Sequence, residues 1–132
     1  MGTLRRALYL EAAIWFVAGL ALAVAPGVLV HRVFGQPTVE GAWLRVLGLQ
    51  AIGLSMFMVL VAQRVEQVWV WAWAFALVTV GTAAVAVLHA AFGLAPGQPG
   101  GLWWGFAAVS VLLSAGLLWG LFRASQEQPF PP

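Results

Sequence analysis

The sequence predicts an all-α integral membrane protein, a bundle of four helices that each cross the bilayer. Three observations predict it: 63% of the 132 residues are apolar, only 8% are charged, and the apolar residues form four uninterrupted stretches. An ordinary soluble domain is about 25% charged, so this chain has too few charges to cover a surface in water. The composition disfavours a soluble enzyme and a disordered segment. The lack of cysteine also excludes a disulfide scaffold.

The four apolar stretches are each long enough to span a membrane. They cover residues 8–30, 43–62, 68–91 and 102–122. About 20 residues at 1.5 Å rise cross the roughly 30 Å hydrocarbon layer. Backbone groups in lipid must be hydrogen-bonded within their own segment, so we expect helices. The four-span domain is expected over residues 1–124, with a disordered polar tail at 125–132.

The connections between the spans contain turn-forming residues. Glycine and proline interrupt residues 31–42 and 92–101, whereas residues 63–67 are so few that the second and third spans must form an antiparallel hairpin. A local pattern also repeats, with phenylalanine three residues and glycine four residues after each histidine (His31-Arg-Val-Phe-Gly and His89-Ala-Ala-Phe-Gly). The repeat suggests two tandem helical hairpins.

The arginines orient the expected bundle. Cytoplasmic segments of membrane proteins carry an excess of basic residues. If the N-terminus lies inside, Arg5, Arg6, Arg64 and Arg123 are cytoplasmic, and Arg32 and Arg45 lie outside. The sequence therefore predicts that both termini are in the cytoplasm.

Small residues mark the faces through which the helices could pack, because lipid gives no hydrophobic drive for helix association. Gly48 and Ser55 share such a face on the second span, and Gly105, Gly116 and Gly120 share one on the fourth. We expect these faces to pack inside the bundle. Self-association through the fourth span is the alternative.

Glu11 is the carboxylate expected inside a span, about one turn from the cytoplasmic surface. A charged group in lipid is costly and is a functional candidate by default. One interpretation is an interfacial carboxylate that is paired with Arg64 or Arg123 or bonded to water. The other is a proton-relay or ligand-binding carboxylate.

A cluster of polar residues is expected at the outer end of the bundle. It consists of His31, Arg32, Glu40, Arg45 and His89. We expect Arg45 to pair with Glu40 or with an anionic ligand, and His89 to face the bundle. The histidines could be interfacial residues without a ligand, could bind a quinone, lipid or other small molecule, or could be axial ligands of a haem. The predicted cofactor set is empty, with haem and quinone as alternatives, and no metal site is expected, because zinc needs more ligands than this cluster provides.

The arrangement resembles the DoxX-like small four-span proteins of the bacterial inner membrane. The resemblance covers most of the chain and is carried by Ala25-Pro26, Phe34-Gly35, Leu44-Arg-Val-Leu-Gly48 and Gly53-Leu54. In that family a further arginine and an acidic residue often follow the third span, whereas this chain has His89 and no acid before Trp103. The resemblance implies a four-helix bundle in the inner membrane, often an accessory or redox-associated protein.

The leading functional hypothesis is a non-enzymatic accessory or stabilising subunit of a larger membrane assembly, since no catalytic constellation is visible. Its expected partners are the lipid bilayer, other membrane subunits or a second copy of the chain, and no nucleic acid. The alternative is a redox-associated protein that binds a quinone, lipid or haem through the outer cluster. A transporter or channel is disfavoured because a polar pathway would need more embedded charges than Glu11.

Overall fold

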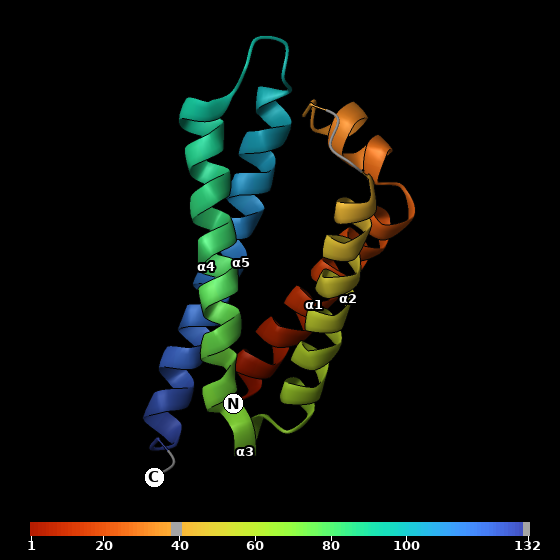
Figure 1. Ribbon diagram of the computed structural model, residues 1–132. Helices are drawn as coiled ribbons and strands as arrows, with labels where there is room; N and C mark the ends of the chain where they lie inside the picture. The colour runs from red at the N-terminus through yellow and green to blue at the C-terminus, as the bar shows by residue number, and fades with distance from the viewer. Residues whose placement is uncertain (38–40, 131–132) are drawn as a thin grey trace.

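A computed structural model describes residues 1–37 and 41–130 of the chain, and these residues form an all-α bundle (Figure 1). The predicted fold class is therefore confirmed, and no strand occurs in the described part of the chain. The long helices are α1 (Gly2–Val24), α2 (Gly41–Gln63), α4 (Ala72–Leu88) and α5 (Gly100–Glu127). Shorter elements are α3 (Val65–Val68), the 3-10 turn η2 (Trp69–Trp71) and two π-helical segments, η1 (Val28–Val33) and η3 (His89–Gly93).

Four continuous helical stretches are long and apolar enough to cross a membrane. They comprise α1, α2, the stretch from α3 to η3 (Val65–Gly93), and α5, with lengths of 23, 23, 29 and 28 residues. Large apolar side chains cover their outer faces: Leu77, Val85 and Leu112 are 77%, 68% and 72% exposed. Such a surface is suited to lipid rather than water. The protein is a multi-pass helical membrane protein.

Two helix boundaries differ from those expected. Helix α1 ends at Val24 instead of continuing to Val30, because Pro26 has no N–H and disfavours the α conformation at Ala25, where φ is −133°. The chain resumes as η1 beyond this break. At the other end of the sequence, α5 extends to Glu127, so residues 125–127 of the expected disordered tail are helical.

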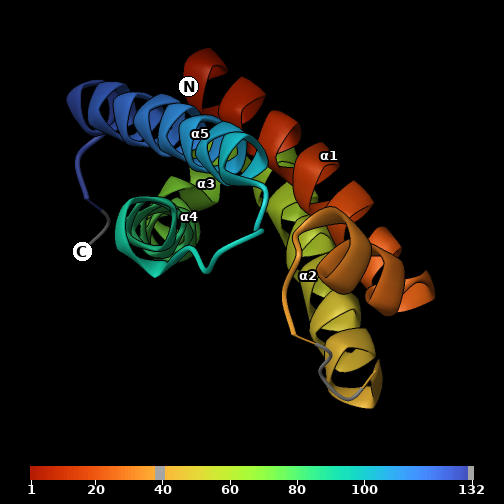
Figure 2. The same ribbon diagram turned by 90° about the horizontal axis from the view of Figure 1, so that it is seen from above.

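The long helices are arranged as two antiparallel pairs, α1 with α2 and α4 with α5, which diverge along the bundle (Figures 1 and 2). Gly19 and Gly48 bring the first pair into backbone contact: a Cβ on Gly48 would lie 2.6 Å from the amide nitrogen of Ala23 and 2.7 Å from the carbonyl oxygen of Gly19. Only glycine fits such a crossing, which is the small-residue packing typical of membrane helices.

The two pairs meet at the end of the bundle that carries both termini, here called the terminal end. A Cβ on Gly120 of α5 would lie 2.8 Å from the Cα of Leu4 in α1. Arg5 donates to the carbonyl oxygen of Ala62 at 3.1 Å and pairs with Glu66, which joins α1 to the α2–α3 turn. Buried apolar side chains fill the space between the helices: Leu4, Leu8, Met58, Val65, Trp69, Phe75, Leu117 and Leu121.

The small residues on α5 divide into an inner and an outer group. Gly120 is buried against α1, whereas Gly105 and Gly116 are exposed, with no atom near the position of an added Cβ. The expectation of packing inside the bundle is therefore corrected for Gly105 and Gly116. Ser55, also expected at a packing face, is buried and donates to the carbonyl oxygen of Ile52.

Candidate ligand-binding cleft

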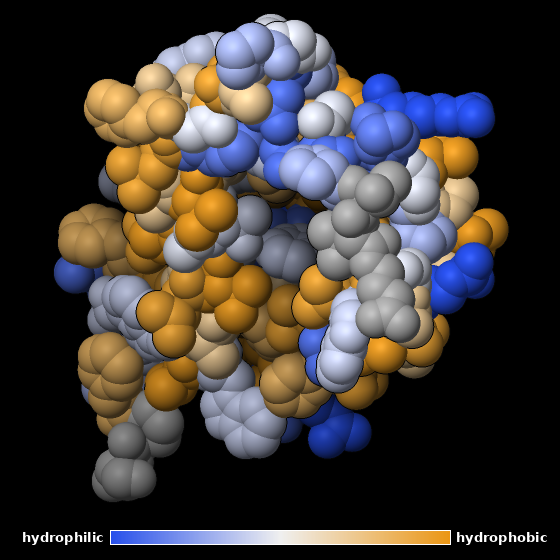
Figure 3. All heavy atoms as spheres, turned by 45° about the horizontal axis from the view of Figure 1, so that its top comes forward, coloured by the Kyte–Doolittle hydropathy of each residue, from blue (hydrophilic) through white to orange (hydrophobic). Residues whose placement is uncertain are grey.

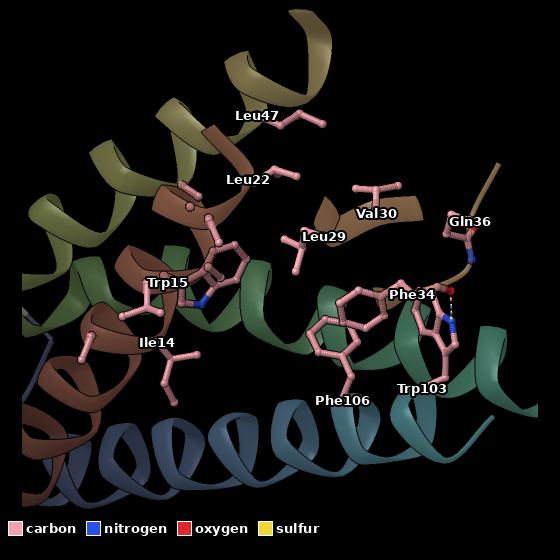
Figure 4. A pocket seen from close by; sticks show the side chains of 16 residues that line it. Ile14, Trp15, Leu22, Leu29, Val30, Phe34, Gln36, Leu47, Trp103 and Phe106 are labelled. Carbon is pink, nitrogen blue, oxygen red and sulfur yellow. Dashed lines mark hydrogen bonds between the residues drawn. The ribbon is translucent and has the colours of Figure 1, made fainter. Parts of the chain in front are cut away.

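The divergence of the two helix pairs leaves an apolar cleft of about 890 Å³ toward the opposite end of the bundle, here called the loop end. Its walls come from α1, η1, α2, the segment after η1, and α5 (Figure 4). The walls are formed by apolar and aromatic side chains such as Ile14, Trp15, Leu22, Leu47 and Phe106. Among the lining residues, Gln36 is the one whose side chain is polar and not aromatic. The volume lies within the range of about 300–1,000 Å³ typical of small-molecule sites.

The break at Pro26 shapes the upper part of this cleft. Because α1 stops at Val24 and the chain restarts as η1, Leu29 and Val30 line the cleft beyond the end of α1. The π-helical hydrogen bond from the Phe34 amide to the Leu29 carbonyl, 3.2 Å long, then places Phe34 at the cleft mouth. Short π-helical segments of this kind often occur at functional sites.

Three aromatic rings form the wall nearest the mouth. Phe34 packs edge-on against Trp103 and Phe106 of α5, with ring centroids 5.2 and 5.8 Å apart. The Trp103 indole N–H donates to the Phe34 carbonyl oxygen at 3.2 Å (Figure 4). These contacts connect the first helix pair to the second across the cleft mouth.

Both histidines meet at Gln36. His31 Nδ1 lies 3.0 Å from the Gln36 carbonyl oxygen, and His89 Nε2 lies 3.1 Å from the Gln36 side-chain nitrogen. The His89 ring also packs on Trp103, with centroids 4.2 Å apart. A Cβ on Gly93 would lie 2.6 Å from His89 Nδ1, so the glycine that follows His89 in the repeated pattern makes room for this ring.

The two loops at this end are also joined directly. Gln98 donates to the Gly35 carbonyl oxygen at 3.1 Å and accepts from the Ala95 amide at 2.9 Å. Gly35 has φ +64°, and a Cβ there would lie 2.9 Å from Pro99. Figure 3, seen with this end turned forward, shows hydrophilic residues gathered there and hydrophobic residues over the flanks.

The structure brings together part of the expected outer cluster. His31 and His89 share Gln36, and His89 faces the bundle, where it is half-buried. Arg32 and Arg45 are exposed, and within residues 1–37 and 41–130 neither forms an ion pair or a side-chain hydrogen bond. Glu40 lies outside the described residues, and with it the expected Arg45–Glu40 pair.

Glu11 is placed differently from its expected interfacial position. It is completely buried, and Thr79 Oγ1 of α4 lies 2.8 Å from Glu11 Oε2. Arg64 and Arg123 are exposed and are not its partners, so the expected ion pair is wrong. A surface salt bridge therefore does not explain why a carboxyl group is buried at this position.

Gln36 was not among the candidate residues from the sequence, although it organises the mouth. The sequence signal was present, because Gln36 directly follows the repeated histidine–phenylalanine–glycine pattern and is one of few uncharged amide side chains. Gln36 was missed because the ligand-binding candidates were ionisable side chains and glutamine is not ionisable. In the described part of the chain, no three His, Cys, Asp or Glu side chains come close enough to hold a metal ion.

Comparison with known proteins leaves the fold and the cleft as the basis for assigning a function. No protein-family model matches the sequence, and neither a curated protein nor a solved structure shows significant similarity to it.

Proposed function

We propose that this membrane protein binds an amphipathic membrane molecule, with its apolar chain in the cleft and its polar headgroup at Gln36. One observation carries the proposal: the cleft is apolar along its length, and its polar lining residue Gln36 contacts both histidines at the mouth, His31 through its backbone carbonyl oxygen and His89 through its side-chain nitrogen. Along α1 the lining runs from Ala13 to Leu22, about 14 Å at 1.5 Å per residue. An elongated chain fits this shape.

The headgroup must supply the selectivity of such a site. A ligand chain that enters the cleft is transferred from a bilayer that is equally apolar. Its burial therefore contributes little hydrophobic free energy. A hydrogen bond to the headgroup at the mouth contributes more, about 0.5–1.5 kcal/mol for a neutral pair. Gln36 and the two histidines are the groups placed to provide it.

The chemistry of the mouth favours an uncharged oxygen-bearing headgroup. Gln36 can donate and accept hydrogen bonds, and neither Arg32 nor Arg45 lines the cleft. A quinone ring or a neutral lipid headgroup fits this set better than a phosphate does. Haem ligation through Nε2 would leave the His31 Nδ1 contact with the Gln36 carbonyl in place, but His89 would have to exchange its Nε2 contact with the Gln36 side chain for iron.

Lipid extraction from the purified protein tests the proposal. Protein in native membrane discs is extracted, and the extract is compared with bulk membrane by mass spectrometry. Ala18 lines the cleft and is exposed to it, so Ala18→Trp should fill the space. Ala84→Trp, at an exposed position on α4 away from the cleft, is the matched control.

We expect wild type and Ala84→Trp to retain one quinone or one lipid class in about a 1:1 ratio, and Ala18→Trp to lose it. The identity of the retained molecule distinguishes a quinone from a lipid. An absorption spectrum with a Soret band would instead identify haem. Extracts indistinguishable from bulk membrane in all three proteins would refute binding.

An accessory role in a larger membrane assembly is the second candidate. It is favoured by the exposed small-residue face of α5 at Gly105 and Gly116, which no helix of this chain covers in the described part. Blue-native electrophoresis should then show a heterologous complex that Gly116→Leu disrupts and Gly53→Leu, at an open position on α2, leaves intact. Migration only as a small homo-oligomer would contradict this role.

The orientation and the location belong to the same proposal. The terminal end carries Arg5, Arg6, Arg64 and Arg123, and the loop end carries Arg32 and Arg45. This distribution supports a cytoplasmic terminal end. The DoxX-like resemblance supports a bacterial inner membrane and a redox-associated role.

A further inference from the structure

The buried carboxyl group of Glu11 lies apart from the residues that line the cleft. Its side chain is completely buried between the helices of the terminal half, in contact with Thr79. The second carboxyl oxygen, Oε1, has no hydrogen-bond partner among the described residues. An ionised carboxylate with an unpaired oxygen in an apolar interior is among the most costly groups a protein can bury.

Thr79 has one hydroxyl proton and two oxygen neighbours. Its Oγ1 lies 2.8 Å from Glu11 Oε2 and 2.8 Å from the carbonyl oxygen of Phe75 in its own helix. Thr82 and Ser114, with a single such neighbour, each donate to the carbonyl four residues earlier. This is the usual bond of a helical hydroxyl. If Thr79 does the same, its oxygen can only accept from Glu11.

We propose that Glu11 binds a proton in the folded bundle and, as a neutral carboxylic acid, donates a hydrogen bond through its O–H to the hydroxyl oxygen of Thr79. A neutral acid has the O–H donor that this geometry requires, and its remaining carbonyl oxygen is far less costly to leave unpaired than a carboxylate oxygen. Protonation of Glu11 thereby stabilises the buried contact between Glu11 of α1 and Thr79 of α4. Ionisation would require this contact to open so that the carboxylate reaches water.

Among residues 1–37 and 41–130, no cation or second acid contacts the carboxyl group of Glu11. Thr79 is the partner found for Glu11, and neither of the two ion pairs in the described residues involves it. The titratable groups on the surrounding elements are exposed or bonded elsewhere: Arg6, Tyr9, Arg45, Arg64 and Arg123 are exposed, Arg5 pairs with Glu66, Met1 with Glu127, and His89 bonds to Gln36.

Infrared spectroscopy of the full chain in lipid discs at neutral pH tests this directly. A protonated carboxylic acid has a carbonyl band that an ionised one lacks. We expect this band in wild type, its loss in Glu11→Gln, and its retention in Glu66→Gln, which removes an exposed carboxylate. Thr79→Val should shift the band, because it removes the oxygen that accepts the hydrogen bond from the carboxylic acid.

Thermal unfolding supplies a second readout. Thr79→Val and Glu11→Gln each remove one partner of the buried hydrogen bond, so both should unfold at a lower temperature than wild type, whereas Glu66→Gln, at an exposed position, should change the unfolding temperature less.

Absence of the band from wild type at neutral pH would overturn the proposal. A band that Thr79→Val leaves in place and unshifted would refute donation to Thr79. If Glu11→Gln does not fold, ¹³C-labelled glutamate in wild type and Thr79→Val still decides both points.

Discussion

Replacing two glycines of α5 by alanine separates helix packing from helix propensity. Gly116 and Gly120 lie one turn apart on the same helix, and each change adds one methyl group. At Gly120 the new Cβ would lie 2.8 Å from the Cα and 3.1 Å from the amide nitrogen of Leu4, whereas at Gly116 it meets nothing within 4 Å. Backbone atoms cannot turn aside as a flexible side chain can, so α1 and α5 must move apart.

The magnitudes follow from these two environments. Glycine to alanine within a helix gains about 0.5–1 kcal/mol from backbone entropy, and both variants receive this gain. Overpacking a close contact costs about 1–3 kcal/mol, and Gly120→Ala alone incurs it. We therefore expect Gly120→Ala to be less stable than Gly116→Ala by about 1–3 kcal/mol, or roughly 5- to 150-fold in the unfolding equilibrium.

Unfolding of the purified protein from mild detergent by increasing amounts of a denaturing detergent measures both variants against wild type. Intrinsic tryptophan fluorescence is a suitable signal, since the chain has eight tryptophans. Equal stability of Gly120→Ala and Gly116→Ala would show that α1 and α5 do not cross at Leu4 and Gly120. That result would refute the closed terminal end of the bundle.

Three further predictions address other parts of the structure. Gly48→Leu should lower the thermal unfolding temperature in detergent by several degrees because it forces α1 and α2 apart. Gly53→Leu, on an open face of α2, should not lower it. An equal decrease in both variants would contradict the close crossing of α1 and α2 at Gly48. Ala95 and Gln126 are both exposed and lie at opposite ends of the bundle. A cysteine at each position should be labelled by an impermeant reagent from opposite sides of the membrane. Labelling of both from one side would contradict four spans. Gly93→Ala should displace His89 from Gln36 and reduce ligand retention without loss of folding; unchanged retention would exclude His89 from the site.

The sequence predicts the helices well because hydropathy and length are local properties. Four apolar stretches of about 20 residues leave few alternatives in a bilayer. The expected end of the first span was wrong for an equally local reason. The hydropathy continues to Val30, whereas Pro26 ends helix α1 at Val24. The hydropathy of residues 28–30 does not reveal that they form a separate π-helical segment.

The relative placement of the helices could not be read from the sequence. A pattern of glycines every few residues identifies a helix face but not what covers it, so Gly116 and Gly120 looked equivalent although only Gly120 meets α1. The burial of Glu11 depends on which residue of α4 lies opposite, and Thr79 is 68 residues away in the chain. Gln36 joins two histidines 58 positions apart for the same reason, because the three meet only through the tertiary fold.

The divergence of the two helix pairs from one closed end has a mechanical consequence. One helix pair can rotate relative to the other about the contacts at the terminal end. Helix α5, with 28 residues, is about 40 Å long. Rotating one pair by about 5° around the terminal end would move its far end by about 3 Å, which would open or close the cleft mouth and stretch the contacts of Phe34 with Trp103 and of Gly35 with Gln98. Small displacements of the helices near Leu4, Glu11 or Gly120 would therefore produce larger displacements near Gln36 at the opposite end. Mutations remote from the ligand should then alter its exchange rate.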